Sequence, residues 1–191
     1  MPVVKNEQEV KRESLFLKYL TGDQGNSLKI KSHLYSIPFH YLNQFKKSVL
    51  CKGKDCSYCS KGFQRRTEYN YYVLLNGDLG VMDIKPSVFF AIQGIVKVQK
   101  KDPRQISWTI IKKGEGINTE YTTSKDDNLT QKEFDQVNAE VEANTEKLTQ
   151  IMLKREEQLY NQYSELESQV GNAYQQPVIE NEEPPMPEEG E

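Results

Sequence analysis

Apolar and polar residues alternate with a period of two along several short stretches in the first two thirds of the chain, a pattern typical of half-buried β-strands. The first stretch places Lys29 and Lys31 on the face opposite Leu28 and Ile30. The strands predicted in this way are residues 28–34, 65–75, 81–84, 106–111 and 121–123. Asn76-Gly77 stands between the second and third strands and predicts a hairpin turn.

A helical spacing of apolar residues marks two other regions. Residues 86–95 predict one short helix between strands. Farther on, Thr130 and Glu133 form a capping box, and apolar residues then recur at steps of three, four or seven. This second region of roughly 44 residues would be about 65 Å long if unbroken. The polar residues Asn144 and Arg155 interrupt its apolar stripe, so one helix and two helices both remain open.

These elements predict a β-rich α+β chain built on a small antiparallel barrel. The predicted parts are a flexible arm at residues 1–14, a binding core at 15–125 with a metal loop at 40–62, a helical segment at 126–174 and an acidic disordered tail at 175–191. The tail is rich in Pro and Glu and cannot bury a core. No apolar stretch approaches the length of a membrane span.

The net charge of −3 hides a division between the two ends of the chain. Residues 1–125 carry 21 Lys and Arg against 11 Asp and Glu, whereas residues 126–191 carry 4 against 17. A basic body of charge +10 suits a polyanion, and the segment of charge −13 suits either that same basic surface or other proteins. The alternative is that these charges only solvate the surface.

All three cysteines lie within nine residues, as Cys51, Cys56 and Cys59. Three cysteines cannot pair fully in disulfides. The first residues show no apolar run behind a basic start, so we expect a reducing cytosol, where clustered cysteines bind metal or do redox work more often than they crosslink. No βαβ unit of the redox type is predicted around Cys56 and Cys59. A structural zinc site is therefore favoured over inert buried cysteines.

A histidine would complete the zinc ligand set. The chain has two, His33 and His40, and His40 lies closer to the cysteines. We favour His40 and keep His33 as the alternative. Four protein ligands leave no position for a reacting water, so the site is expected to hold a loop and not to catalyse.

Cations that follow phosphates and aromatic rings that stack on bases hold single-stranded nucleic acid, and both occur on the predicted strands. The candidate cations are Lys29, Lys31, Lys46, Lys47, Arg65, Arg66, Lys112 and Lys113. The candidate aromatic residues are Tyr69, Tyr71, Tyr72, Trp108 and Tyr121. Trp108, Tyr69 and Tyr71 share faces with apolar neighbours, so a core position is the alternative for them. Tyr72 is predicted to face solvent.

No catalytic constellation stands out in the sequence. If His40 binds metal, His33 is the one histidine left, and no serine or cysteine partner is evident for it. Gly114-Glu-Gly116 lacks the further glycine and the helix of a dinucleotide site. Carboxylates are sparse in the body, which argues against a two-metal nuclease. We therefore expect a protein that is not an enzyme.

The order of these features resembles the zinc-containing single-stranded DNA-binding proteins of tailed bacteriophages, of the T-even type and its relatives. The resemblance covers residues 15–125 and rests on His40, the Cys51-x4-Cys56-x2-Cys59 loop, the tyrosine-rich strand, Trp108-x-Ile110 and the segment 112–122. The Cys51–Cys56 spacing is tighter than in the T-even protein, and the helical segment 130–174 has no clear counterpart.

The resemblance implies an OB-fold core with an inserted zinc loop that coats single-stranded DNA in phage replication, recombination and repair. It also implies that the acidic tail recruits replication or recombination partners in the cytoplasm of the infected bacterial host. The helical segment would pack on the barrel or pair with a neighbouring copy along DNA. Whether RNA is also bound stays open. A competing hypothesis is a zinc-containing adaptor that binds a replication or transcription partner through this helix.

Overall fold

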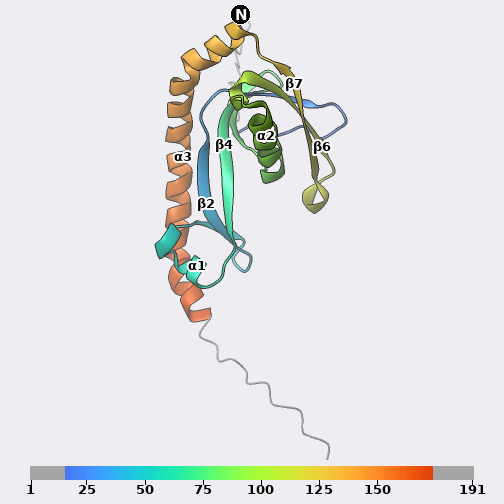
Figure 1. Ribbon diagram of the computed structural model, residues 1–191. Coiled ribbons are helices and arrows are strands. Elements are labelled where there is room, and N and C mark those ends of the chain that lie inside the picture. The colour runs from blue at the N-terminus through green and yellow to red at the C-terminus, as the bar shows by residue number, and fades with distance from the viewer. Residues whose placement is uncertain (1–15, 174–191) are drawn as a thin grey trace, which may run out of the picture.

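The structure, a computed structural model, describes residues 16–173, so the expected arm at 1–14 and tail at 175–191 lie outside the described residues. The described part is an α+β fold with a seven-stranded, mostly antiparallel sheet and a long C-terminal helix (Figure 1). The strands are β1 (Asn26–Ile30), β2 (Tyr35–Leu42), β3 (Lys47–Leu50), β4 (Arg65–Leu75), β5 (Asp78–Asp83), β6 (Ile106–Lys113) and β7 (Glu120–Asn128). The helices are α1 (Ser57–Ser60), α2 (Pro86–Gln99) and α3 (Gln131–Ala173), with 3-10 turns η1 (Gly53–Asp55), η2 (Pro103–Gln105) and η3 (Gly116–Asn118).

Strand β4 organises the sheet, whose order is β3-β2-β4-β1-β6-β7 with β5 also paired to β4. The first half of β4 pairs with β2 and its last residues pair with β1, while β5 pairs with the same last residues from the other side. The predicted hairpin is confirmed, because Asn76 and Gly77 take the positive φ values of 53° and 96° that a tight β4–β5 turn requires.

One apolar cluster fills the space between the strands and α2. Trp108 is fully buried in it, and its indole nitrogen donates a hydrogen bond of 3.1 Å to the Pro103 carbonyl. The other members include Leu28, Ile30, Tyr71, Val73, Ile110, Val88 and Ile92. Alternate residues of β1, β4 and β6 thus face a shared core, which is the physical basis of the period-two pattern in the sequence.

The segment before β1 lies against two strands. Phe16 forms a parallel bridge with Val81 of β5, and Thr21 forms one with Lys112 of β6. The Leu17 amide also donates to the Val81 carbonyl at 2.8 Å. Because the segment contacts both β5 and β6, the side chains between Phe16 and Thr21 lie beside these two strands.

The C-terminal region is one continuous helix of 43 residues, α3, and not two helices. The predicted capping box is present at its start: the Glu133 amide donates to Thr130 Oγ1 at 3.3 Å, and the Thr130 amide donates to Glu133 Oε2 at 2.9 Å. Since β7 continues to Asn128, the sheet extends beyond the boundary expected at residue 125.

Two polar interruptions of the α3 stripe face the sheet and find partners there. The buried Asn144 amide donates to the Lys31 carbonyl at 3.2 Å. Arg155 Nη2 lies 3.0 Å from Glu68 Oε1 on β4. Because both groups are satisfied by the sheet, they do not break the helix.

Helix α3 packs along the sheet (Figure 1), so of the two expected arrangements the structure shows α3 packed on the strands of its own chain. Leu148, Met152 and Leu159 pack against Ile37, Tyr72 and Val81. The prediction that Tyr72 faces solvent is wrong, because α3 covers the face of β4 opposite to the barrel core.

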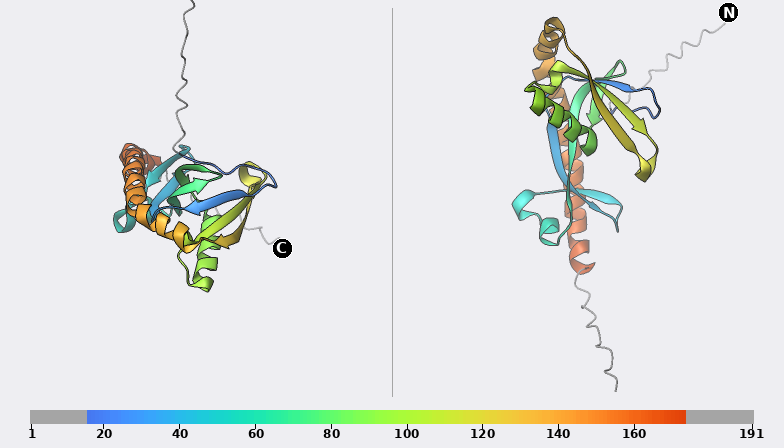
Figure 2. Two further views of the ribbon diagram at one scale, coloured as in Figure 1. Left: turned by 90° about the horizontal axis from the view of Figure 1, so that it is seen from above. Right: turned by 45° about the vertical axis from the view of Figure 1, so that its right-hand side comes forward.

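The two ends of the molecule differ in what projects from them. Figure 2 shows the β6–β7 hairpin extending away from α3, whereas β3 and the loop that follows it lie beside the C-terminal part of α3. Within residues 16–173, no helix combines the length and the apolar character that crossing a membrane requires.

Candidate metal centre and nucleic-acid surface

Four side chains converge in the metal loop, residues 40–62. His40 lies on β2, Cys51 directly follows β3, Cys56 precedes α1 and Cys59 lies within it. The pairing of His40 with Val49 brings the imidazole beside the chain that leaves β3. One ligand atom from each of the four residues lies within 4.8 Å of the others, so the cluster can hold a metal ion.

The spacing of these atoms suits a tetrahedral ion. Cys56 Sγ and Cys59 Sγ each lie 3.4 Å from His40 Nε2, and Cys51 Sγ lies 3.6 Å from Cys59 Sγ. A tetrahedral ion with metal–sulfur bonds of about 2.3 Å and a metal–nitrogen bond of about 2.0 Å separates its ligand atoms by about 3.5–3.8 Å. The three cysteines are free thiols, without a disulfide.

The orientation of His40 is fixed from behind. Its Nδ1 lies 3.1 Å from the Gln64 carbonyl, so Nδ1–H donates to that oxygen and Nε2 is left to face the three sulfurs. Such a second partner is typical of metal-ligating histidines. His33, the alternative ligand, lies outside the cluster, with Nε2 3.4 Å from Glu142 Oε1.

The local backbone favours an ionised thiol at Cys56. Burial alone would raise the pKa of Cys56, but hydrogen bonds from the backbone amides of Cys59, Lys52 and Tyr58 lower it. At Cys59, desolvation together with the neighbouring thiols of Cys51 and Cys56 raises the pKa to about 11. Ionising the Cys59 thiol therefore calls for a compensating positive charge, which a bound dication would supply.

The C-terminal part of α3 clamps the metal loop. Tyr163 is buried, and its hydroxyl accepts from the Ser57 amide at 3.1 Å and lies 2.8 Å from Ser57 Oγ. Its ring meets Tyr58 edge to face at 4.8 Å, and the Lys52 ammonium lies 3.6 Å from its ring centroid. Helix and loop thus share contacts one residue away from the ligand Cys56.

Three of the predicted stacking residues are buried, which removes them from a surface role in this structure. Trp108 is 0% exposed, Tyr71 4% and Tyr72 8%. Trp108 and Tyr71 belong to the core between the strands and α2, and Tyr72 belongs to the contact with α3. A base cannot stack on rings that apolar neighbours already cover.

Three of the lysines predicted to bind nucleic acid lie at the contact with helix α3. Lys29 lies 3.5 Å from Glu133, and Lys47 lies 3.4 Å from Glu165. Lys31 is half-buried, and its carbonyl accepts from Asn144. These three lysines line the contact with α3, so they are weaker candidates for phosphate binding than the sequence predicts.

A first exposed basic surface lies beside the metal loop. Arg65 and Arg66 begin β4 with exposed side chains, and Lys46 is exposed in the β2–β3 turn. The Arg66 guanidinium carbon lies 5.8 Å from the ring centroid of Tyr41, which is itself 36% exposed. The sequence alone did not single out Tyr41, although it directly follows His40.

A second surface surrounds a pocket of about 330 Å³ beside β5 and β6. Lys112 and Tyr121, directly opposite each other in the β6–β7 pairing, both line it. Lys18 and Lys85 complete its basic lining, but the sequence analysis did not identify them as candidates. The adjacent Lys18 and Tyr19 were the one local signal in the sequence for this surface. Lys113 lies outside the pocket, 3.2 Å from Asp23. We call this space the lysine pocket.

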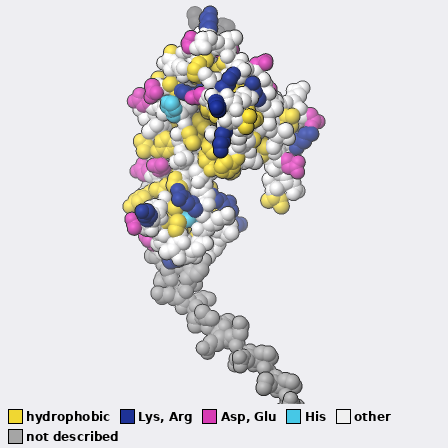
Figure 3. All heavy atoms as spheres, in the orientation of Figure 1, with side chains coloured by type: hydrophobic (Ala, Val, Ile, Leu, Met, Phe, Trp, Pro, Cys, Tyr) yellow, Lys and Arg dark blue, Asp and Glu magenta, His cyan; other side chains and the backbone are white. Residues whose placement is uncertain are grey.

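Aromatic residues lie between the two surfaces along β4. Arg65, Thr67 and Tyr69 share one face of this strand. The Tyr69 ring stacks on Phe89 at 3.9 Å between centroids, and Phe90 beside it is 61% exposed. On the face seen in Figure 3, Lys and Arg side chains border a hydrophobic area and recur near the metal loop.

Comparisons with known proteins return nothing to set beside this geometry: no family model, no curated protein and no solved structure matches the chain.

Proposed function

We propose that this protein binds single-stranded DNA, largely without regard to sequence, and that a structural zinc ion holds its metal loop. The observation that carries the proposal is the lysine pocket, whose lining combines the half-buried Tyr121 with Lys18, Lys112 and Lys85, the last of which pairs with Asp83 at 2.9 Å. Cations and an aromatic face are the two devices that hold an unpaired strand.

Zinc suits the donor set of the metal loop better than other common ions. Three thiolates and one imidazole in tetrahedral spacing are typical of structural zinc, whereas Mg²⁺ and Ca²⁺ prefer oxygen ligands. Protein ligands would fill all four coordination positions, so the ion would stabilise the loop and would have no position for a reactive water.

The connectivity supports an OB-type reading of the barrel. Strand β1 pairs with both β4 and β6, β4 continues into β5, and α2 then leads to the β6–β7 hairpin. Five strands with one helix after the third is the OB order, and its strand faces and loops bind oligonucleotides. The metal loop stands between the first and second strands of this scheme.

Salt dependence tests the proposal directly. We expect wild-type protein to bind a fluorescent oligo-dT in anisotropy titrations, with affinity falling as salt rises. Replacing Lys18 and Lys112 by Ala should reduce the log–log salt slope by about 1.4 if each lysine contacts one phosphate. The matched control, Lys97→Ala with Lys132→Ala, removes two exposed lysines outside the pocket. Absence of binding by the wild type at low salt would refute the proposal.

Arg65 and Arg66 extend the test to the metal-loop surface. Their joint replacement by Ala should also weaken oligo-dT binding and flatten its salt slope. An unchanged affinity and slope would remove this surface from the DNA path and leave the lysine pocket as the site.

The adaptor hypothesis has less support. The apolar stripe of α3 that would bind a partner packs on β2, β4 and β5 instead. A role in phage replication, recombination and repair, in a bacterial host cytoplasm, rests on the family resemblance, as do tail partners and self-association along DNA.

A further inference from the structure

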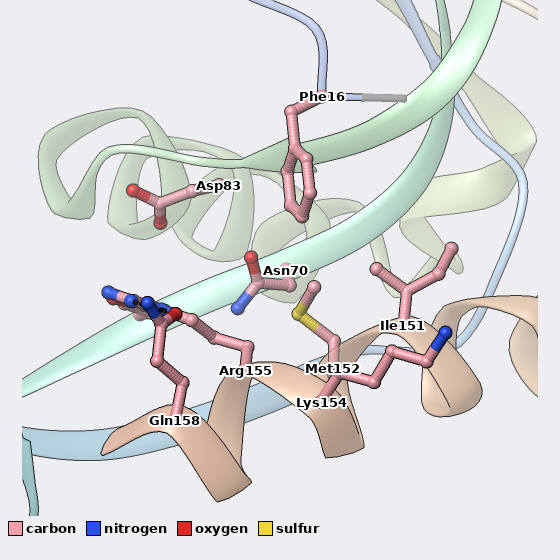
Figure 4. Close-up of a pocket in the computed structure, with 9 residues that line it drawn as sticks. Phe16, Asn70, Asp83, Ile151, Met152, Lys154, Arg155 and Gln158 are labelled. Carbon is pink, nitrogen blue, oxygen red and sulfur yellow. Dashed lines mark hydrogen bonds and ion pairs between the residues drawn. The ribbon is translucent and has the colours of Figure 1, made fainter. Parts of the chain in front are cut away.

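A second cavity, of about 600 Å³, lies between the middle of α3 and the outer face of β4 and β5 (Figure 4). Its size falls within the range of roughly 300–1,000 Å³ that is usual for small-ligand sites. Its lining residues are Phe16, Glu68, Asn70, Asp83, Ile151, Met152, Lys154, Arg155 and Gln158. We call it the asparagine pocket.

Asn70 is the unusual member of this lining. Its residue is only 2% exposed, yet its side-chain nitrogen has no hydrogen-bond partner among residues 16–173. Figure 4 shows the carboxamide between Phe16 and Met152, directed into the pocket. Buried amide donors are nearly always satisfied, so this one calls for an acceptor that the described chain does not supply.

The side-chain nitrogens of the buried Asn26 and Asn144 have hydrogen-bond acceptors. Asn26, 1% exposed, donates from Nδ2 to the Leu20 and Ile110 carbonyls and accepts from the Leu20 amide at 2.8 Å. Asn144 donates to the Lys31 carbonyl. The free donor of Asn70 is therefore specific to the pocket that it lines.

The charged part of the lining consists of two ion pairs and one further cation. Arg155 and Glu68 pair at 3.0 Å, Asp83 pairs with Lys85 at 2.9 Å, and Lys154 adds a positive charge. Phe16, 47% exposed, presents a flat ring, and Ile151 and Met152 add apolar surface. These features suit a flat, uncharged ring that carries a hydrogen-bond acceptor.

We propose that the asparagine pocket receives one base of the bound strand, an inference that rests on the proposed function. The base lies against Phe16, and Asn70 Nδ2 donates to an acceptor on its edge. The adjoining lysine pocket, which shares Phe16 and Asp83, holds the phosphates of the same stretch. Because an asparagine amide complements N7 and N6 of adenine, the preferred base is adenine.

The test uses the side-chain amide resonances of Asn70 in full-length, isotope-labelled protein. Titration with deoxyadenosine monophosphate and with an oligonucleotide containing one dA in a dT tract should shift these resonances to saturation. Asn70→Leu should weaken binding of the dA-containing strand by about fivefold and leave all-dT binding nearly unchanged, as expected for one hydrogen bond.

Stability separates this role from a structural one. Asn70→Leu removes an unpaired buried donor, so its unfolding midpoint should stay the same or rise. Asn26→Leu, the matched control, removes four hydrogen bonds and should lower the midpoint. Phe16→Ala should weaken the dA preference, while Phe90→Ala, an exposed ring outside the pocket, should preserve it.

The outcomes distinguish the two proposals. If the wild type binds DNA but the Asn70 amide does not move and Asn70→Leu binds dA normally, an ordered water satisfies Asn70 and the base pocket is refuted. If no strand binds but deoxyadenosine monophosphate still shifts the Asn70 amide, the pocket stands and single-stranded DNA binding fails.

Discussion

The core between the sheet and α2 and the core of the metal loop are stabilised in different ways. The sheet and α2 bury one large apolar cluster, to which β1, β4, β6 and α2 contribute. The metal loop buries a small one, and two of its members, Tyr163 and Leu166, come from α3. A region with so little apolar area of its own would depend on a bound ion and on the helix, whereas the sheet and α2 supply their own core.

Helix α3 meets the two regions in different ways. Its middle buries Leu148, Met152 and Leu159 against β2, β4 and β5, and this mainly apolar contact also contains the Arg155–Glu68 ion pair. Its C-terminal part adds the Tyr163 hydroxyl bonds and the Lys52 ammonium over the Tyr163 ring. The second contact is directional, so it should sense whether the metal loop is correctly folded.

The largest expected effect is the loss of the ion from the metal loop. Cys56→Ser removes one of four ligands, and structural zinc sites supply apparent folding energies of about 10–16 kcal/mol in small peptides. We expect metal content by mass spectrometry to fall from one equivalent to almost none and the loop amides to lose hydrogen-exchange protection. Trp108, in the barrel core, should keep its fluorescence.

Ser60→Ala is the control for this change. Ser60 lies on the same short helix, its hydroxyl donates to the Ser57 carbonyl at 2.8 Å, and it is not one of the four candidate metal ligands. It should retain the full metal content. Full metal content in Cys56→Ser would show that the cluster is not the metal site.

The next largest effect tests the apolar contact of α3. Leu148 is fully buried, so Leu148→Ala should lower the free energy of unfolding by about 2–5 kcal/mol in urea titrations. Leu153→Ala, at a position on the same helix that is 52% exposed, should cost under about 1 kcal/mol. Equal effects at the two positions would mean that α3 does not pack on the sheet as described.

A smaller effect tests the directional contact. Tyr163→Phe leaves the ring in place but removes the hydroxyl that accepts from the Ser57 amide, a loss of about 1–2 kcal/mol. The loss should appear in exchange of the loop amides and in faster zinc release to a chelator. Tyr160→Phe, at a half-exposed ring, serves as control. Unchanged zinc release in Tyr163→Phe would show that this contact with the helix does not stabilise the metal loop.

The sequence predicted the individual strands of the sheet better than the elements around them. The predicted strand 65–75 matches β4, because alternation sets its face and Asn76-Gly77 sets its end. The predicted strand 28–34 stops at Ile30 instead, because the buried Ser32 hydroxyl accepts from the Tyr72 amide and replaces a ladder bond. A side chain that intercepts the backbone in this way leaves no periodic signal.

The candidate sites also differ in how much of each could be predicted from the sequence. The metal ligands were predictable, since three of the four lie within nine residues and the β2–β3 pairing carries the fourth to them. The burial of Tyr72 and the ion pairing of Lys29 could not be predicted from the sequence, because both follow from the docking of a helix far along the chain. Lys18 and Lys85 likewise join Lys112 only through tertiary structure.

The smallest expected effect lies on the barrel side, at the turn between α2 and β6. Partial burial would raise the pKa of Asp102, but hydrogen bonds from the Arg104 side chain and amide outweigh it and lower the pKa. A carboxylate with a lowered pKa stabilises the fold above its ordinary pKa, and this contribution disappears as the pH falls through the folded value.

Because Asp102 is partly exposed and screened, Asp102→Asn should cost about 0.5–1 kcal/mol at pH 7. The difference from wild type in urea titrations should shrink as the pH falls below the ordinary carboxyl pKa and through the lowered pKa of Asp102, with metal content at pH 7 unchanged. Asp78→Asn, at an exposed carboxylate, should show no such trend. A deficit that persists at low pH would assign the effect to the cap geometry and not to the charge.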